Sequence, residues 1–331
     1  MSRLAVARAA LLAATAALVV VLPFVVSNYR TYQLAQVAIY AMAVMGVNIV
    51  TGYAGQVSLG HGAFMLIGAY TTSSLTVHAS FPYGATIPIA AVVAGVAGFL
   101  FGFPALRLAG VYLALATLAL ATALPGVAEH FSGLTGGSIG MRVETPAPPF
   151  GWHVSDNVWI YVLSWSIAAL LFALSWLILR GRFGRALRAI RDRHAAAAAS
   201  GVNLALYKTV AFGVSAAFAG VAGSLLVLSL GYINPGVFPL ILSILLLTGA
   251  VVGGLGTLPG PIFGGLLIVY LWVTPFYTTL EHVPKDASPV IYGVLTILVM
   301  FAVPNGLVGT LRRVIGIAAG VSWGRRSASV S

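Results

Sequence analysis

Long apolar runs, separated by short polar or glycine-rich stretches, extend along almost the whole chain. A helix that crosses a membrane needs about 20 mostly apolar residues. No charged residue occurs between Arg30 and Arg107 or between Lys208 and Glu281, so each block is long enough for roughly three crossings. The pattern predicts an all-α fold of about ten membrane-spanning helices. The predicted spans are residues 9–27, 33–51, 60–78, 84–104, 110–128, 158–179, 209–228, 238–256, 262–280 and 289–308.

The composition also indicates a membrane protein. Of the 331 residues, 60% are hydrophobic and 7% are charged, and the mean hydropathy is +1.02. A soluble domain carries roughly 25% charged residues, so we predict a polytopic integral membrane protein. About eight or nine crossings with one re-entrant segment is the alternative to ten. The pI of about 10.3 does not indicate nucleic-acid binding, because membrane topology accounts for the positions of the basic residues.

The distribution of positive charge predicts the orientation of the chain. Cytoplasmic loops carry an excess of Lys and Arg, and such residues gather in the loop 180–208 and in the tail 309–331. Both segments are expected in the cytoplasm, together with the N-terminus, whose first apolar run is expected to be retained as a helix. The loops 129–157 and 281–288 carry charges of both signs and are expected on the outer side.

The stretch GYAGQVSLGHGAF, residues 52–64, interrupts the first charge-free block with glycine and polar residues. Backbone that leaves a helix inside a membrane is tolerated only where it is buried in protein or lines water. The stretch therefore predicts a broken or re-entrant helix along a substrate path, where helix ends and free carbonyls can hold a zwitterion. The candidate path residues are Gly52, Gly55, Gln56, Ser58, Gly60, His61 and Gly62. An interhelical turn or close packing through glycine is the alternative, as it is for the second glycine-rich element, 249–265.

The side chains available for chemistry indicate transport rather than catalysis. His61 has no second metal ligand at a suitable spacing, and Ser58 with His61 has no orienting acid, so an intramembrane protease has little support. All six acidic residues fall in predicted loops or at span ends. Since proton-coupled carriers use carboxylates inside the membrane, a carrier or channel acting alone is disfavoured, although backbone carbonyls can bind sodium. The chain lacks a G-x-x-x-x-G-K-[ST] loop, so we expect no cofactor or metal here and ATP bound by a partner.

The basic loop contains a predicted helix over residues 186–201. Five consecutive alanines, 195–199, favour helix formation, and Gly201 is suited to end the helix. Arg188 and Asp192 are spaced for an i, i+4 ion pair. The residues expected to meet a partner ATPase are Arg185, Arg188, Arg191, Asp192, Ala197 and Gly201. The alternative is a basic loop attracted to anionic lipid headgroups.

Several motifs together resemble a known family. The run GVNIVTGYAGQVSLGHGAFMLIGAYT, 46–71, and the run GRFGRALRAIRD, 181–192, are similar to the permeases of branched-chain amino-acid ABC importers. Further similar stretches are LRLAGVYLALATLAL (106–120), LTGGSIGM (134–141), GVNLALYKTVAFGVSAAFAGVAGSL (201–225) and GGLGTLPGPIFGG (253–265). They cover nearly the whole chain in the family's order, and the chain resembles the M-type subunit more than the H-type subunit.

This resemblance implies one permease domain over residues 1–331 in a bacterial inner membrane. The implied partners are a second, different permease subunit, two ABC ATPases, a periplasmic substrate-binding protein and membrane lipid. The helix 186–201 would be the coupling helix that enters a cleft of the ATPase. Where the family often has acidic residues in this helix, the chain has His194 and Ala198. Related permeases move urea, short amides and other hydrophobic or aromatic acids, so the resemblance leaves these substrates open beside branched-chain amino acids.

Overall fold

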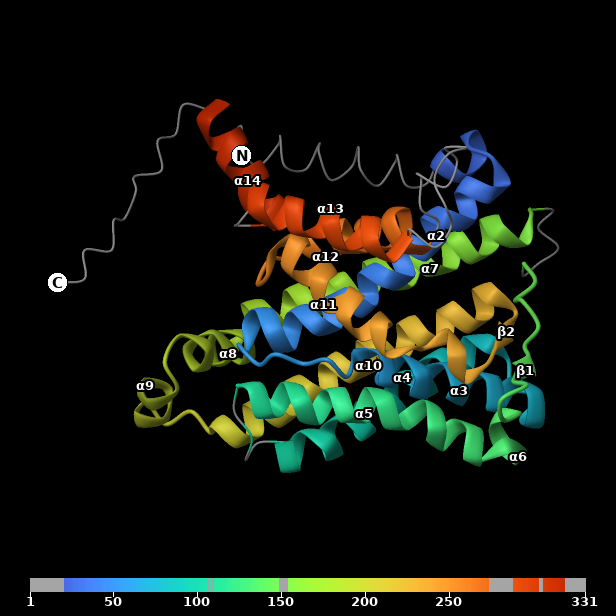
Figure 1. The fold of residues 1–331 in the computed structure, drawn as a ribbon, viewed down its shortest axis with the longest axis horizontal. Coiled ribbons are helices and arrows are strands. Elements are labelled where there is room, and N and C mark those ends of the chain that lie inside the picture. Colours follow the sequence, from blue (N-terminus) through green and yellow to red (C-terminus); the bar gives the residue numbers. More distant parts are fainter. Residues whose placement is uncertain are drawn as a thin grey trace.

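A computed structural model describes residues 21–105, 108, 110–148, 154–273, 288–303 and 306–318. The described residues form a bundle in which most helices run roughly along the long axis of the molecule (Figure 1). The elements are α2 (Asn28–Val47), the π-helix η1 (Asn48–Tyr53), α3 (His61–Ala79), α4 (Tyr83–Ala105), α5 (Val111–His130), α6 (Ser132–Thr135), β1 (Met141–Arg142), α7 (Asp156–Arg180), α8 (Arg182–Asp192), α9 (His194–Ala199), α10 (Leu204–Leu230), β2 (Tyr232–Ile233), the 3-10 helix η3 (Pro235–Val237), α11 (Leu240–Gly254), α12 (Gly260–Ile268), the π-helix η4 (Val269–Val273), α13 (Ser288–Ala302) and α14 (Gly306–Ala318).

Helices α2 and α10 form the centre of the bundle. α10 packs against α4, α3 and α2, and α2 also packs against α7 and α12. Most residues of the two central helices are buried, whereas α4, α5 and α7 leave most of their apolar surface uncovered. Exposed Val96, Phe99 and Phe103 on α4 are examples. Apolar side chains on the outer helices are the expected surface of a protein whose solvent is lipid.

Glycine allows the central helices to approach closely. A Cβ atom added at Gly68 of α3 would collide with the backbone of Gly220 on α10. A Cβ atom at Gly223 would likewise collide with the carbonyl of Met65. Because lipid provides no hydrophobic drive between helices, small residues at such contacts let dispersion forces hold the backbones together. Part of the glycine content is therefore explained by packing.

The two ends of α10 are fixed by local interactions. At its start the Oδ1 atom of Asn203 accepts a hydrogen bond from the Leu206 N–H at 3.1 Å, which caps the helix. At its end Gly231 has φ +67°, and β2 then pairs antiparallel with β1. The hydroxyl of Tyr232 donates to the Ile139 carbonyl. The segment between α5 and α7 is thereby attached to the end of α10.

Six helices within the described ranges are long and apolar enough to cross a membrane. They are Asn28–Tyr53, Tyr83–Phe103, Val111–His130, Asp156–Arg180, Leu204–Leu230 and Pro235–Gly254. Shorter apolar stretches are Gly260–Val273 and Thr296–Leu311. The all-α, polytopic fold class is confirmed, while the count of about ten crossings stays a prediction. Most of the first predicted span, 9–27, and the end of the span 262–280 lie outside the described residues.

The last predicted span, 289–308, is interrupted in the structure and stays a prediction as a membrane crossing. Instead of one helix over 289–308, α13 ends at Ala302 and α14 begins at Gly306. Val303 precedes Pro304 in the sequence, and a residue before proline is disfavoured in the α conformation. Gly306 has φ +73°, which accommodates the change of direction. α14 then continues to Ala318, so the expected tail 309–331 begins as a helix.

Candidate functional site

The predicted broken helix is present. α2 continues into η1, the chain is non-helical from Ala54 to Gly60, and α3 begins at His61. Gly55 has φ +69°, a conformation that glycine adopts without strain. In Figure 1 this light-blue stretch runs from the α8 end of the bundle back toward its middle. The polypeptide therefore leaves and resumes helical structure inside the bundle.

Neighbouring helices satisfy the polar groups at the start of α3. The N–H of Gly62 donates to Ser243 Oγ on α11 at 3.0 Å. The ring of His61 lies between Ser58 Oγ, 3.4 Å from Nδ1, and Ser215 Oγ on α10, 3.3 Å from Nε2. His61 is fully buried. Both of these hydroxyls are neutral, so the geometry fits a structural hydrogen-bonding role for His61.

Two glycines of this segment lie close to side chains of neighbouring helices. A Cβ atom at Gly62 would lie 2.7 Å from Ser243 Oγ, and one at Gly60 would lie 3.2 Å from the Thr117 side chain. The Leu59 N–H donates to Thr117 Oγ1 on α5 at 2.9 Å. In this structure the start of α3 is thus enclosed by α5, α10 and α11. These helices must separate from it before the segment can line an open path.

Gln56 differs from the other polar residues of the segment. Its side chain is only 7% exposed, and its Oε1 atom is buried without a hydrogen-bond partner. Its backbone is held, because its N–H donates to Val50 O at 3.0 Å and its carbonyl accepts from Thr51 Oγ1 at 3.1 Å. An unpaired buried oxygen is unusual in proteins, so it is the group in this segment most in need of an explanation.

The two glycine-rich elements meet at the end of the broken helix. Asn48 of η1 is fully buried; its Nδ2 atom donates to the Thr257 carbonyl at 2.7 Å, and its Oδ1 atom accepts from the Gly256 N–H at 2.8 Å. A Cβ atom at Gly52 would lie 2.5 Å from the nitrogen of Gly256. Asn48 was not among the predicted path residues. Its signal was an amide side chain inside an apolar run, which in a membrane must find partners.

The single helix predicted over residues 186–201 is wrong. The structure has two helices, α8 and α9, which are separated at Arg193 by extended backbone with φ −155° and ψ 106°. α8 buries Ala186, Leu187 and Ile190, whereas Ala197 is the buried residue of α9. The turn at Arg193 brings the chain back toward the start of α10. Helix propensity in the alanine run did not decide how far the helix extends, because tertiary packing overrides it.

Contacts at α8 and α9 differ in part from those predicted. Gly201 has φ +79° and follows the end of α9. Its N–H donates to the Ala198 carbonyl, and the Val202 N–H donates to the Ala197 carbonyl. Together these two bonds form a glycine motif that ends the helix. The predicted pair of Arg188 and Asp192 is not formed. Arg188 Nη1 donates to the Leu179 carbonyl at 3.3 Å. Asp192 instead lies 3.8 Å from Arg191 Nε.

Arg191 reaches the broken helix directly. Its Nη1 atom donates to the Gly52 carbonyl at 2.5 Å. Arg185 makes a longer contact, 3.4 Å from Nη1 to the exposed Arg180 carbonyl. Of the residues expected in the loop site, Arg191 is therefore the one that the structure brings together with the expected path residues.

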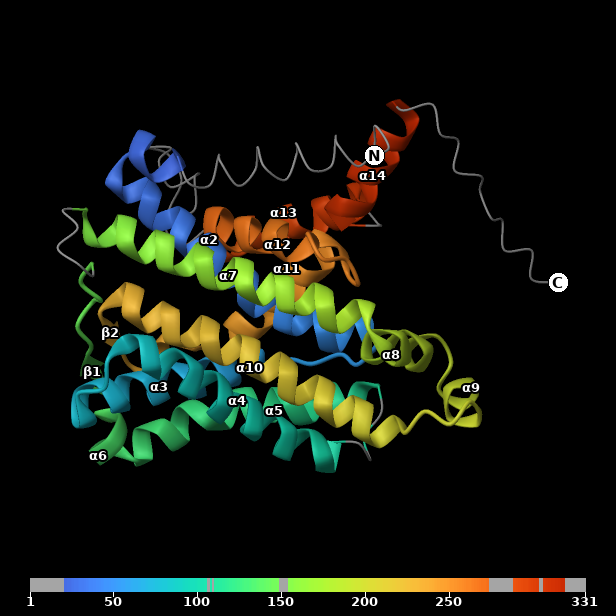
Figure 2. The same cartoon turned by 180° about the vertical axis from the view of Figure 1, so that it is seen from behind.

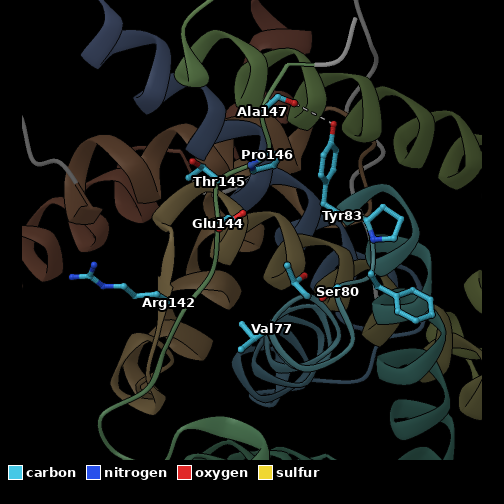
Figure 3. Close-up of a pocket in the computed structure, with 11 residues that line it drawn as sticks. Val77, Ser80, Tyr83, Arg142, Glu144, Thr145, Pro146 and Ala147 are labelled. Carbon is cyan, nitrogen blue, oxygen red and sulfur yellow. Dashed lines mark hydrogen bonds between the residues drawn. The ribbon is translucent and has the colours of Figure 1, made fainter. Parts of the chain in front are cut away.

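An open pocket of about 640 Å³ lies at the other end of the bundle, between the α3–α4 turn and the segment after β1 (Figure 3). The Tyr83 hydroxyl donates to the Ala147 carbonyl at 3.5 Å, and the side chain of Arg142 points away from the other labelled residues (Figure 3). The predicted path residues do not line it. Its lining residues are Thr76, Val77, Ser80, Phe81, Pro82, Tyr83, Arg142, Glu144, Thr145, Pro146 and Ala147.

Comparison with known proteins identifies the family. A family model described as the permease component of branched-chain amino acid transport systems matches residues 29–300. The chain belongs to this permease family. The matched part of the permease, from α2 into α13, contains both glycine-rich elements and the α8–α9 loop.

Individual relatives agree with this assignment. The permease is 30% identical over 340 residues to the high-affinity branched-chain amino acid transport system permease protein LivM of Escherichia coli strain K12, with 96% of this chain and 78% of the relative covered. It is 30% identical over 290 residues to LivH of Salmonella typhimurium, covering 82% of this chain and 91% of the relative. It is 28% identical over 286 residues to BraD of Pseudomonas aeruginosa, with the same shares covered. The broader coverage by LivM confirms the resemblance to the M-type subunit. No solved structure gives a significant match.

Proposed function

We propose that this permease is a membrane subunit of a bacterial ABC importer that moves branched-chain or other hydrophobic amino acids across the inner membrane, with ATP hydrolysed on partner chains. Membership of the family and the printed function of its relatives support this proposal. The contact of a basic loop with the broken helix, through Arg191 and Gly52, is the observation that carries it. This contact joins the α8–α9 loop, which is suited to bind a cytoplasmic partner, to the broken helix, which is suited to bind substrate.

The arrangement of charges supports an external source of energy. The four acidic residues in the described ranges lie at helix ends or in loops: Glu129, Glu144, Asp156 and Asp192. Carriers driven by protons use carboxylates within the membrane. Because the described carboxylates lie at helix ends or in loops, the subunit fits transport driven by an ATPase better than transport driven by a gradient.

The proposed complex contains a second, different permease subunit, two ABC ATPases and a periplasmic substrate-binding protein. Relatives named as LivM and LivH both match the chain, which supports two kinds of permease subunit. We also propose that both termini are cytoplasmic. The basic α8–α9 loop and α14 lie toward the same end of the molecule in Figures 1 and 2, while β1, β2 and α6 lie at the other. This fits cytoplasmic placement of the basic segments.

Uptake of radiolabelled leucine tests the function. Vesicles with the complete transporter should accumulate leucine only when ATP is on the cytoplasmic side, and the permease alone should not respond to a proton or sodium gradient. Excess isoleucine should compete, and excess urea should not. Gradient-driven uptake by the permease alone would favour a carrier, and competition by urea or acetamide alone would favour an amide permease.

We propose that α9 and the exposed face of α8 meet the ATPase. α9 protrudes beyond α8 at one end of the bundle in both views (Figures 1 and 2), and its residues other than Ala197 are exposed. A segment that protrudes and is ended sharply by Gly201 can enter a cleft of a partner. The exposed residues include Arg185 and Arg188 on α8.

Replacing Ala197 with proline should disrupt this contact. The Ala197 N–H donates to the Arg193 carbonyl at 3.1 Å, so proline removes this bond and destabilises the helix by about 3 kcal/mol or more. Substrate-stimulated ATP hydrolysis should then be lost in the reconstituted transporter. His194→Pro is the matched control, because it occupies the first helical position and follows an already extended Arg193. Normal stimulation in Ala197→Pro would refute the role of α9.

We further propose that residues 52–62 line the substrate path when the surrounding helices separate, with the Gln56 amide available to the cargo. A Gly62→Leu substitution does not separate this idea from simple packing, because either account predicts a collision with Ser243. Gln56 does separate them. If the segment only packs, replacing a buried amide whose Oε1 atom has no partner with an apolar side chain is neutral or stabilising.

Gln56→Leu should therefore leave thermal stability unchanged or higher and reduce ATP-driven leucine uptake. A lost hydrogen bond of about 1 kcal/mol corresponds to roughly a fivefold reduction. Gln36→Leu on α2 is the comparison variant outside the proposed path: Gln36 Oε1 is also buried and unpaired, while its Nε2 donates to Ser229 Oγ at 3.0 Å. Its uptake, at equal amounts in the membrane, should stay near that of the unsubstituted protein. Unreduced uptake in Gln56→Leu, at equal amounts in the membrane, would remove Gln56 from the path.

A further inference from the structure

We propose that Arg191 transmits movement of the α8–α9 loop to the glycine-rich segment, by holding the carbonyl end of the broken helix. The inference rests on the proposed function, since it assumes an ATPase that moves the loop. The Arg191 side chain would then pass the movement of the loop at the cytoplasmic surface to the substrate path.

The end of the broken helix offers a site for a cation. The last carbonyls of a helix lack intrahelical partners and carry partial negative charge. At this end the N–H groups of Ala54 and Gln56 donate to the carbonyls of Ile49 and Val50, and the Gly52 carbonyl accepts from Arg191 Nη1 at 2.5 Å. A hydrogen bond from a charged donor is shorter and stronger than one between neutral groups. Arg191 thus acts as a cap supplied by another element.

Glycines in two segments leave space for this one side chain. A Cβ atom at Gly55 would lie 2.9 Å from Arg191 Cγ, and a Cβ atom at Gly256 would lie 2.9 Å from Arg191 Nη1. Both glycines have positive φ, +69° and +71°. The guanidinium therefore lies where α8, the broken helix and the α11–α12 turn meet. Asn48 connects the last two of these segments by its paired hydrogen bonds to Gly256 and Thr257.

α8 is attached to the broken helix along one face. Leu187, Ile190 and Arg191 have the i, i+3, i+4 spacing that places side chains together. Leu187 and Ile190 are fully buried, and Leu187 belongs to an apolar cluster with Val50 and Tyr53. Apolar contact is non-directional and permits sliding. The hydrogen bond of Arg191 to a backbone carbonyl fixes the position of α8 along the helix.

The exposed ion pair of Arg191 does not explain the residue's position. The side chains of Arg191 and Asp192 are 46% and 73% exposed, and the Nε to Oδ1 distance is 3.8 Å. Surface pairs of this kind stabilise little. The distinguishing contact of Arg191 is the one it makes inward, to Gly52.

The experiment compares Arg191→Met with Arg191→Lys in the complete reconstituted transporter. Methionine keeps an unbranched apolar stem without a donor, whereas lysine keeps both the charge and a donor. Substrate-stimulated ATP hydrolysis and leucine uptake should fall at least about fivefold in Arg191→Met, the lower range of allosteric coupling, and should recover in part in Arg191→Lys. The ATPase should copurify with both variants. Arg313→Met, an exposed arginine of α14, is the control for loss of a positive charge.

The outcomes separate the two proposals. Coupled hydrolysis and uptake in Arg191→Met equal to those of Arg313→Met would overturn the transmission role. Failure of Arg191→Met to assemble, while Arg313→Met assembles, would show a structural role and also overturn it. Absence of stimulation or uptake in the unsubstituted transporter would contradict the proposed function rather than the role of Arg191.

Discussion

A helix that is interrupted inside a membrane must have its freed backbone groups paired by protein, because lipid offers no hydrogen bonds. The interruption at residues 54–60 imposes this requirement on the whole bundle. Ser243 of α11 pairs with the Gly62 N–H, Thr117 of α5 with the Leu59 N–H, and Arg191 of α8 with the Gly52 carbonyl. Helices α5, α8 and α11, which are distant from one another in the sequence, thus all contact the interrupted segment. The same contacts that make the break tolerable make it sensitive to movements of its neighbours.

This requirement changes the meaning of the glycine-rich sequence. Gly60 and Gly62 allow Thr117 and Ser243 to approach closely, since an added Cβ atom would lie 3.2 Å from Thr117 and 2.7 Å from Ser243 Oγ. Packing and transport are consequently not exclusive explanations. A segment held by hydroxyl groups of three separate helices is enclosed in this structure. In the proposed function it lines the path once those helices separate, and Gln56, with its unpaired amide oxygen, is the proposed contact to the cargo.

Much of the fold follows from the sequence, because lipid imposes a simple rule on length and polarity. The apolar runs predicted helices, and the polar stretch after Gly52 predicted the break. The sequence did not predict the division of the loop at Arg193, since five alanines favour a helix wherever they stand and only packing of Leu187 and Ile190 decides its direction. Nor did it predict the pairing of Asn48 with Gly256 and Thr257, which are 208 and 209 residues away along the chain. Such contacts depend on the assembled bundle.

Arg191 is proposed to hold α8 and the glycine-rich segment together, so the two should move as one body. The chain contains no cysteine, so spin labels can be placed at pairs of introduced cysteines. One variant carries labels at the exposed residues Ala189 of α8 and Val57 of the broken segment, and the other at Val57 and Phe103 of α4. Pulsed electron paramagnetic resonance would then measure distances in the complete transporter, without nucleotide and with ATP trapped. If α8 and the glycine-rich segment move as one body, the distance between Ala189 and Val57 is the same in both states, and the distance between Val57 and Phe103 differs. A changed distance between Ala189 and Val57 would contradict this prediction, because α8 would then slide over the segment that it is claimed to hold.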